Sequence, residues 1–255
     1  MELNSSQPEL NPNPSNTSNN EESAPDSQIN PTTSLAYWNN CPATASGMLA
    51  MLGSYPWCTR IDLQGSKTFL AKVRRFFPSC PATGKLSRGV DCGAGVGRVS
   101  EGFLSQVCEA VDVVEPVQKF TDVLREAVRE RGNGWLGSVY NVGLEEWMPQ
   151  QKYDLIWVQW CVGHLTDGQL VRLFERCRGW LGDGGFVIVK ENLSTDPEGR
   201  DMFDEVDSSV TRTDGKFRKI FEEAGMKVVL AQGQMGFPKT VRLLPVRMYA
   251  LRPMS

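Results

Sequence analysis

The segment DCGAGVGR, residues 91–98, decides the fold of this 255-residue chain. Its first two residues belong to a short predicted strand over residues 90–92, and it leads into residues 96–107, which have helical periodicity. Glycines at such a strand-to-helix turn let the backbone bend tightly and approach a ligand closely. The first N–H groups of the helix have no partner inside it and can face the same ligand. The segment therefore predicts a binding site beyond the carboxyl end of a strand in an α/β sheet.

The acidic residue that ends the next predicted strand, Glu115, supports this interpretation. A carboxylate in that place can accept hydrogen bonds from both hydroxyl groups of a ribose. The G-x-G-x-G spacing differs from the G-x-G-x-x-G spacing of dinucleotide-binding proteins. This difference weakens the argument for a pyrophosphate-binding site but does not exclude one. It suits a nucleoside that has no phosphate. Three glycines can also form nothing more than a tight turn, but the flanking strand, the helix and Glu115 favour a cofactor site.

Strand and helix patterns alternate from Arg60 onward. We predict helices over residues 66–77, 96–107, 117–131, 168–180 and 213–223. We predict strands over residues 90–92, 110–114, 154–160, 184–189, 228–230 and 246–251. Such alternation is typical of a mostly parallel sheet covered by helices on both faces. The last two strands have no helix between them, so we expect them to form an antiparallel edge hairpin.

Composition limits the classes of protein to consider. The 27 basic and 30 acidic residues give a net charge of −3, which argues against a general nucleic-acid binder. The chain has no apolar run long enough for a membrane span and no secretory signal. Seven cysteines without a C-x-x-C pair favour free thiols in a reducing compartment, and a single histidine excludes a His-rich metal site. We expect a cytoplasmic or nuclear protein, or one present in both, that binds no metal, nucleic acid or membrane.

The first part of the chain differs from the rest. Residues 1–34 are rich in Asn, Ser, Pro, Glu and Thr, and no Lys or Arg precedes Arg60. Such a segment buries too little apolar surface to offset its ordering entropy, so we predict a disordered tail over 1–34. The folded domain is predicted over 35–255, with residues 35–77 as a helical cap over the site. We expect a monomer.

The glycine turn and Glu115 resemble those of the Rossmann-like class I methyltransferases that use S-adenosylmethionine. In that family the turn holds the methionine part of the cofactor and the acidic residue holds the ribose. The resemblance implies one set of cofactor-binding residues: Gly93, Gly95, Arg98, Glu115, Leu144, Glu145 and Gln159. It places Arg98 against the cofactor's carboxylate, a pairing that suits the planar guanidinium. Leu144 and Glu145 are expected near the adenine, and Gln159 beside the methionine.

Two further blocks carry a narrower resemblance. IWVQWCVGHLTD (156–167) and DEVDSSVTR (204–212) are similar to blocks of the protein α-N-terminal methyltransferases, which modify the exposed amine of chains that begin Xaa-Pro-Lys. Tyr37-Trp38 with Gly47-Met48-Leu49, and Lys190-Glu191-Asn192, agree with the same family. The resemblance extends from about Tyr37 to about Arg252. It implies a seven-stranded methyltransferase domain with S-adenosylmethionine as cofactor and protein N-termini as substrates.

The chemistry can also be argued from the residues. Methyl transfer from a sulfonium requires alignment and a lone pair on the acceptor. An α-amine has a pKa near ~7.7–8.0, so the site must bind an ammonium and then remove its proton. That calls for carboxylates, a carbonyl acceptor and a group that titrates near the working pH. The chain offers such groups at four positions near predicted strand ends: His164, Asn192, Asp204 and Asp207.

The resemblance divides these residues by role. It implies that His164 and Asp207 accept or relay the proton, that Asn192 orients the amine, and that Trp38, Trp160 and Asp204 form the peptide channel. Simpler alternatives remain open at this point. His164 could cap or pack near a helix start, Asp207 could be a helix N-cap, and Trp38 could only fasten the cap.

Two other functions also remain open. The chain could methylate a small-molecule amine or acid on the same fold. It could also be a catalytically silent partner protein that binds the cofactor.

Overall fold

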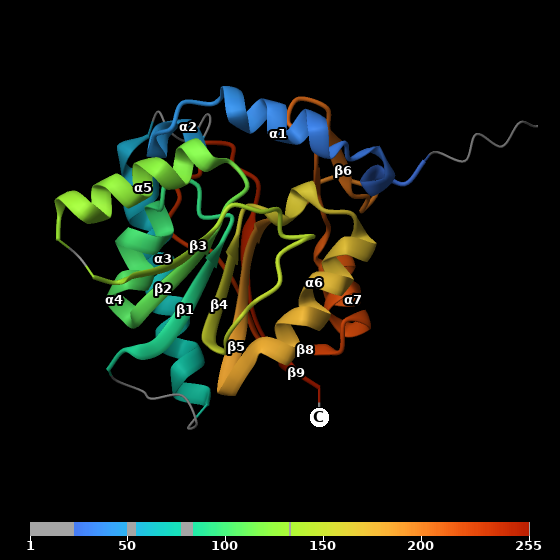
Figure 1. Cartoon of the computed structure of the whole chain (residues 1–255). Helices are drawn as coiled ribbons and strands as arrows, with labels where there is room; N and C mark the ends of the chain where they lie inside the picture. The colour runs from blue at the N-terminus through green and yellow to red at the C-terminus, as the bar shows by residue number, and fades with distance from the viewer. Residues whose placement is uncertain (1–22, 50–54, 78–83, 133, 255) are drawn as a thin grey trace, which may run out of the picture.

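The computed structural model describes residues 23–49, 55–77, 84–132 and 134–254. Its centre is a seven-stranded sheet of order β3-β2-β1-β4-β5-β9-β8 (Figure 1). The strands are β1 (Leu86–Cys92), β2 (Cys108–Val114), β3 (Leu136–Tyr140), β4 (Tyr153–Gln159), β5 (Leu181–Asn192), β8 (Met226–Gly233) and β9 (Val246–Pro253). The pairs among β1 to β5 are parallel, whereas β9 is antiparallel to both β5 and β8. The predicted sheet and its edge hairpin are confirmed.

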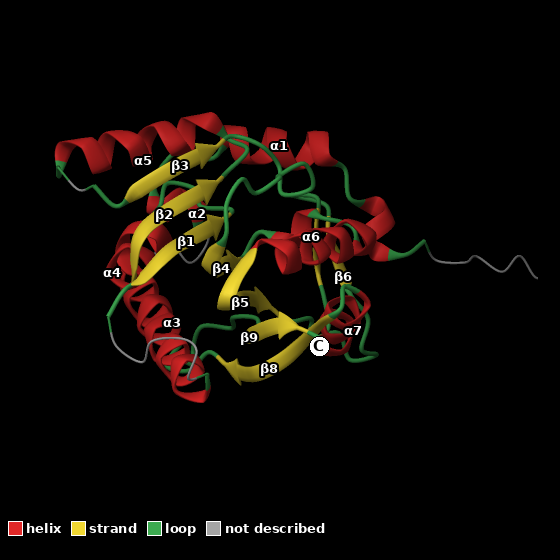
Figure 2. Ribbon diagram, turned by 60° about the horizontal axis from the view of Figure 1, so that its bottom comes forward, coloured by secondary structure: helices red, strands yellow, loops and turns green. Residues whose placement is uncertain are grey.

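Two layers of helices cover the sheet (Figure 2). One face packs against α3 (Pro56–Phe76) and α5 (Gln118–Glu130), and the other packs against α6 (Asp167–Trp180) and α7 (Asp214–Glu223). Both faces of the sheet are apolar, as two neighbouring residues of β4 show. Trp157 belongs to the hydrophobic cluster under α3 and α5, and Val158 belongs to the cluster under α6 and α7. Side chains alternate between the faces of a strand, so a strand buried on both sides is apolar throughout.

Residues 98–107 form the short helix that follows the glycine turn. Its middle, Ser100–Leu104, is π-helical, and its end is α4 (Ser105–Val107). The helix therefore begins two residues later than predicted. None of the three shortest strands was predicted: β3, and the hairpin of β6 (Met202–Asp204) and β7 (Ser209–Thr211). Each has only three to five residues, which is too short for a clear alternating pattern.

The predicted boundary of the disordered tail is corrected. Residues Pro25–Gln28 form a 3-10 turn, and α1 (Pro31–Asn40) follows it. Asn30 caps α1 by accepting hydrogen bonds from the N–H groups of Thr32 and Thr33. Residues 25–34 therefore belong to the folded domain, and residues 1–22 lie outside the described residues.

Side-chain and backbone contacts with the domain explain why this polar segment is ordered. The N–H of Asn30 donates to Oγ of Ser208 at 2.8 Å, and the Asp26 carboxylate accepts from the N–H of Asp167 at 3.0 Å. Figure 1 shows α1 lying across the carboxyl ends of the strands, near α2 (Ala45–Met48). None of the helices within the described ranges is long and apolar enough to cross a membrane.

Candidate active site

A cavity of about 410 Å³ lies at the carboxyl ends of β1, β2 and β4. All seven residues predicted to bind the cofactor line it: Gly93, Gly95, Arg98, Glu115, Leu144, Glu145 and Gln159. Trp38, Trp160 and His164 line it as well. The other three predicted residues are not among its lining: Asn192 ends β5, Asp204 ends β6, and Asp207 lies between β6 and β7. The structure thus brings ten of the thirteen into one cavity.

The glycine turn follows the edge of this cavity in a conformation that favours glycine. Gly93 and Gly95 have φ of 72° and 54°, in the left-handed region. A Cβ on Gly93 would lie 2.4 Å from Cβ of Cys161, so a side chain there would also collide with the loop after β4. The N–H groups of Gly93 and Ala94 donate to the Val114 carbonyl at 2.8 and 3.1 Å, which ties the turn to the end of β2.

Glu115 lies next to this turn with its carboxylate almost fully buried. Its two oxygens accept hydrogen bonds from the N–H groups of Gly95 and Val117, both at 2.9 Å. Burial raises the pKa of Glu115, although the two backbone donors oppose the shift. The side chain is thus fixed at the cavity wall, where it can accept further hydrogen bonds from hydroxyl groups.

Arg98 is held from two sides. Its Nη1 lies 2.7 Å from Oδ2 of Asp62, a carboxylate of α3 with no exposed surface. Its guanidinium lies over the Trp160 ring, 5.4 Å from the centroid. The Asp62 carboxylate also accepts hydrogen bonds from Nε2 of Gln159 at 3.0 Å and pairs with Nζ of Lys190 at 2.5 Å.

Sequence reasoning missed Asp62 and Lys190. An acidic residue on an amphipathic helix usually faces solvent, and a lysine inside an apolar strand has no pattern of its own. The one available signal is that Lys190 directly follows the apolar run of residues 186–189 in β5, because a lysine buried there needs a partner.

Both ring nitrogens of His164 contact α1. Nδ1 lies 2.9 Å from Oγ of Ser34, and Nε2 accepts a hydrogen bond from the indole N–H of Trp38 at 3.1 Å. Burial lowers the pKa of His164, while the charge of Asp207 and the Ser208 backbone oppose the shift. The imidazole is therefore neutral at pH 7 and can accept a proton.

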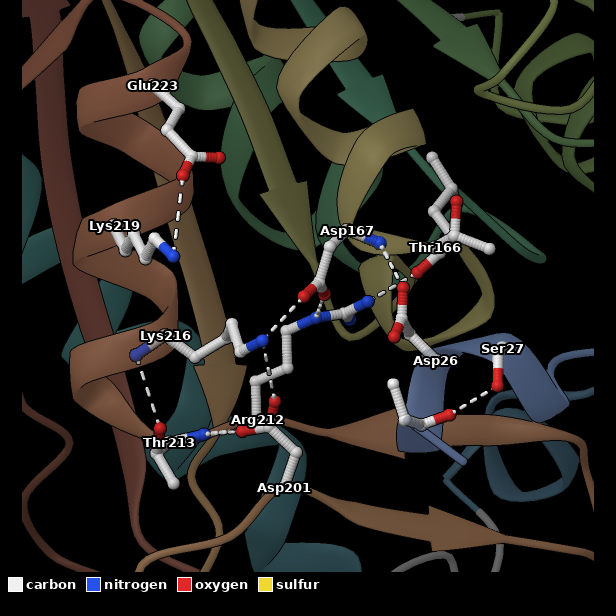
Figure 3. A network of polar contacts seen from close by, with 12 residues as sticks. Asp26, Ser27, Thr166, Asp167, Asp201, Arg212, Thr213, Lys216, Lys219 and Glu223 are labelled. Atoms are coloured by element: carbon white, nitrogen blue, oxygen red, sulfur yellow. Dashed lines mark hydrogen bonds and ion pairs between the residues drawn. The ribbon is translucent and has the colours of Figure 1, made fainter. Parts of the chain in front are cut away.

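The loop that carries His164 is braced by Arg212, which directly follows β7 and whose side chain is fully buried. Its guanidinium donates to the carbonyls of Val162 and Leu165, on either side of the histidine, at 3.1 and 2.5 Å. Its Nε pairs with Asp167 at 2.8 Å. Asp167 has two further contacts (Figure 3): its N–H donates to the Asp26 carboxylate, and its own carboxylate accepts from Nζ of Lys216. Residues far apart in the sequence therefore hold this one loop.

The segment with Asp207 has an unusual backbone. Ser208 has φ of 55°, in the left-handed region, and its hydroxyl accepts the N–H of Asn30. Oδ1 of Asp207 is buried and has no hydrogen-bond partner within the described part of the chain. Asp204 differs, because it is exposed and its Oδ1 accepts the N–H of Val206 at 2.8 Å. The charge of Asp207 opposes the lowering of the His164 pKa and, after burial, helps to raise the pKa of Tyr37.

Two other buried carboxyls were missed by sequence reasoning. Asp91 lines the cavity and accepts a hydrogen bond from Oγ of Ser100 at 2.5 Å, and burial raises its pKa to about 7. Burial likewise raises the pKa of Glu191 to about 7. Oε1 of Glu191 accepts the N–H groups of Cys161 and Val162, so it holds the loop after β4. Among the described residues, no group of three or more His, Cys, Asp or Glu could hold a metal ion.

These features match the chemistry of S-adenosylmethionine. The left-handed backbone at Gly93 and Gly95 lets the turn line the cavity, the Glu115 carboxylate suits a ribose, and the Arg98 guanidinium suits a carboxylate. Buried Leu144 offers an apolar surface to a base. The sheet order and this cavity define a Rossmann-like methyltransferase that uses S-adenosylmethionine.

The family follows from comparison with known proteins. The model of the family described as AdoMet dependent proline di-methyltransferase matches residues 26–252, and the chain belongs to that family. It is 41% identical over 221 residues to alpha N-terminal protein methyltransferase 1 of Drosophila melanogaster, a match that covers 86% of this chain and 75% of the relative. It is 36% identical to N-terminal Xaa-Pro-Lys N-methyltransferase 1-A of Xenopus laevis, covering 80% of this chain and 88% of the relative.

Solved structures agree with the fold. A Leishmania major S-adenosylmethionine-dependent methyltransferase has 34% identity and a TM-score of 0.75, covering 87% of this chain and 82% of that one. The N-methyltransferase NodS of Bradyrhizobium japonicum, in complex with S-adenosyl-L-homocysteine, has 14% identity and a TM-score of 0.62. That match covers 89% of this chain and 100% of NodS, and it supports the fold alone.

Proposed function

We propose that this protein transfers methyl groups from S-adenosylmethionine to the α-amino group of proteins that begin Xaa-Pro-Lys. One observation carries the proposal: a neutral histidine, His164, lines the cofactor cavity and lies close to the carboxylate of Asp207. The names of the curated relatives support the same acceptor.

The cofactor supplies an electrophilic methyl group when it is bound. Glu115 would bind the ribose, Arg98 would bind the carboxylate, and Leu144 and Glu145 would border the adenine, since all four line the cavity. The glycine turn, with its left-handed backbone at the cavity wall, would lie beside the methionine part. These residues align the donor and need no covalent contact with it.

The acceptor amine must lose a proton before it can react. The unpartnered Oδ1 of Asp207 receives the α-ammonium, and Asn192 orients it. The neutral imidazole of His164 takes the proton, directly or through Asp207. The lone pair that this frees would accept the methyl group that the bound cofactor supplies.

The peptide channel follows from the residues around this point. Trp38 and Trp160 offer aromatic faces that suit the proline ring at the second position. The exposed carboxylate of Asp204 suits the lysine at the third position. An acidic third residue would be repelled by the same charge.

Mass spectrometry of a synthetic Xaa-Pro-Lys peptide, incubated with the protein and S-adenosylmethionine, tests the proposal. We expect the peptide with a free N-terminus to gain mass in steps of about 14 Da, one CH₂ for each methyl group added. The acetylated control should gain none, although it keeps its lysine. A peptide with Glu at the third position should react much more slowly. Methylation of the acetylated peptide, or turnover of free metabolites only, would contradict the proposal. Cofactor binding without any turnover would favour the silent partner protein.

We also propose that the protein acts as a monomer in the cytoplasm, the nucleus or both. The six cysteines within the described ranges form no disulfide, which suits a reducing compartment. Sedimentation at equilibrium and fractionation of cells would test the two parts of this proposal separately.

A further inference from the structure

The most heavily buried ion pair among the described residues lies against Arg98 and Gln159 of the cavity. Asp62 of α3 and Lys190 of β5 are both 0% exposed, and their side chains are 2.5 Å apart. Nζ of Lys190 also donates to the Asp62 carbonyl at 2.9 Å and to Oγ of Ser66 at 3.0 Å. Burying such a pair costs several kcal/mol unless the geometry and further hydrogen bonds compensate it. A pair kept at that cost, next to a ligand cavity, calls for an explanation beyond stability.

The contacts of the Asp62 carboxylate suggest one. It bonds to Arg98 and to Gln159, the two cavity residues assigned to the methionine part of the cofactor. The backbone carbonyl of Lys190 accepts the N–H of Trp160 at 3.1 Å, and the Trp160 ring faces the Arg98 guanidinium. The Asp62 carboxylate thus contacts Arg98 and Gln159 directly, and the strand that carries Lys190 holds the backbone of Trp160.

The charges also add up in a useful way. Lys190 balances the charge of Asp62, so the positive charge of Arg98 remains available to a ligand in the cavity. The Arg98 side chain is only 9% exposed. An arginine with a fixed fork loses less entropy when it binds a carboxylate than a mobile one. Asp62 of α3 thus determines the orientation of the Arg98 guanidinium.

We propose that Asp62, neutralised by Lys190, is a positioning residue that holds Arg98 and Gln159 ready for the carboxylate of S-adenosylmethionine. It acts through these two residues and does not itself line the cavity. The inference rests on the cofactor assignment within the proposed function and not on the identity of the acceptor.

The test compares two ligands that differ only in the carboxylate: S-adenosylhomocysteine and its decarboxylated analogue. The test variant is the double substitution Asp62→Asn with Lys190→Met, which removes one negative and one positive charge and so conserves the net charge of the cluster. Calorimetry should show the Kd of S-adenosylhomocysteine rising about tenfold or more, the loss expected for a weakened charged hydrogen bond. The Kd of the decarboxylated analogue should change by less than about twofold.

Asp112 and Arg88 provide the matched control. Their side chains are 2.7 Å apart, Asp112 is fully buried, and neither residue lines the cavity. Asp112→Asn with Arg88→Met removes a similar pair from the same sheet and should leave the ratio of the two Kd values unchanged. Equal weakening of both ligands by the Asp62 variant would assign the pair a purely structural role, and no weakening would also overturn the inference.

Two further measurements keep the test decisive. If the double variant does not fold, Asp62→Glu conserves every charge while moving the carboxylate by one methylene, and it should also weaken S-adenosylhomocysteine selectively. If the unaltered protein fails to bind S-adenosylhomocysteine, the cofactor assignment itself fails. If the unaltered protein binds it and does not methylate Xaa-Pro-Lys peptides, the acceptor assignment fails and the Asp62 test still stands.

Discussion

The indole N–H of Trp38 donates to Nε2 of His164 at 3.1 Å, and this contact fixes the tautomer of the only histidine in the chain. An indole nitrogen can only donate, so Nε2 must be the unprotonated nitrogen of the neutral ring. The proton then lies on Nδ1, where the hydroxyl of Ser34 accepts it at 2.9 Å. Nε2, the nitrogen that can take a proton, thus already accepts the hydrogen bond from Trp38, and this bond must break before Nε2 can be protonated.

The two contacts should move the pKa of His164 in opposite directions. Trp38→Phe removes a donor that favours the neutral ring, so the pKa should rise. Ser34→Ala removes an acceptor that favours the charged ring, so the pKa should fall. Each shift should be about half a unit to one unit, the value of one hydrogen bond. An NMR titration of untagged protein measures this directly, because its one histidine gives one imidazole signal. Shifts of the same sign in both variants would contradict this tautomer.

Removal of either acid–base residue should reduce turnover and leave cofactor binding intact. We expect His164→Ala and Asp207→Ala each to lower kcat by about 10²-fold or more on an Xaa-Pro-Lys peptide, because general base catalysis contributes that much. The Kd of S-adenosylhomocysteine should stay within about threefold of the unaltered value. Normal kcat in both variants would end the acid–base proposal.

Glu115 should be essential for the nucleoside part of the cofactor. Glu115→Gln removes the charge that two backbone N–H groups and the ribose require, so the Kd of S-adenosylhomocysteine should rise about 10- to 100-fold. Calorimetry provides the measurement. Glu109 lies at the other end of the same strand and is exposed, so Glu109→Gln is the matched control and should bind normally. Comparable losses in the two variants would argue against a ribose contact.

Asp91 should make stability depend on pH in an unusual direction. Its pKa is raised from 3.8 to about 7 by burial, so the folded protein keeps a proton that the unfolded chain releases. Its favourable contribution is complete below about pH 4 and is lost as the pH rises towards 7. Each unit of difference corresponds to roughly 1.4 kcal/mol, so a rise of about 3 units makes the loss on the order of 4 kcal/mol.

Asp91→Asn removes that dependence because an amide does not titrate. Urea unfolding of both proteins at pH 5 and pH 8 gives the comparison, since other titrating groups are common to the two. The unaltered protein should lose more of its free energy of unfolding between these pH values than the variant does. Equal losses would show that Asp91 is already ionised at pH 5.

The sequence was most informative where geometry is local. The glycine turn and Glu115 are neighbours at two strand ends, so their spacing predicts the cofactor cavity and its position. The helices after the turn were placed within a residue or two because their apolar faces are periodic. These features depend on contacts that the pattern itself encodes.

Features that depend on distant partners were missed. Asp62 is 128 residues from Lys190 and 36 from Arg98, and nothing in its own helix predicts either contact. The contact of Ser34 with His164 spans 130 residues. Composition predicted disorder for residues 25–34 because it measures the apolar area that a segment can bury by itself, and this segment is ordered by hydrogen bonds to other elements.

The anchoring of residues 25–34 matters to anyone who shortens the chain to obtain crystals or higher yields. A version that starts at Leu35 would lose the Asp26 carboxylate, the Asn30 cap and the Ser34 hydroxyl together. It would retain the sheet and most of the cofactor cavity, so folding and ligand binding would look normal. Weak activity in such a preparation would then be a product of the trimming, because the imidazole would be left with a single tether.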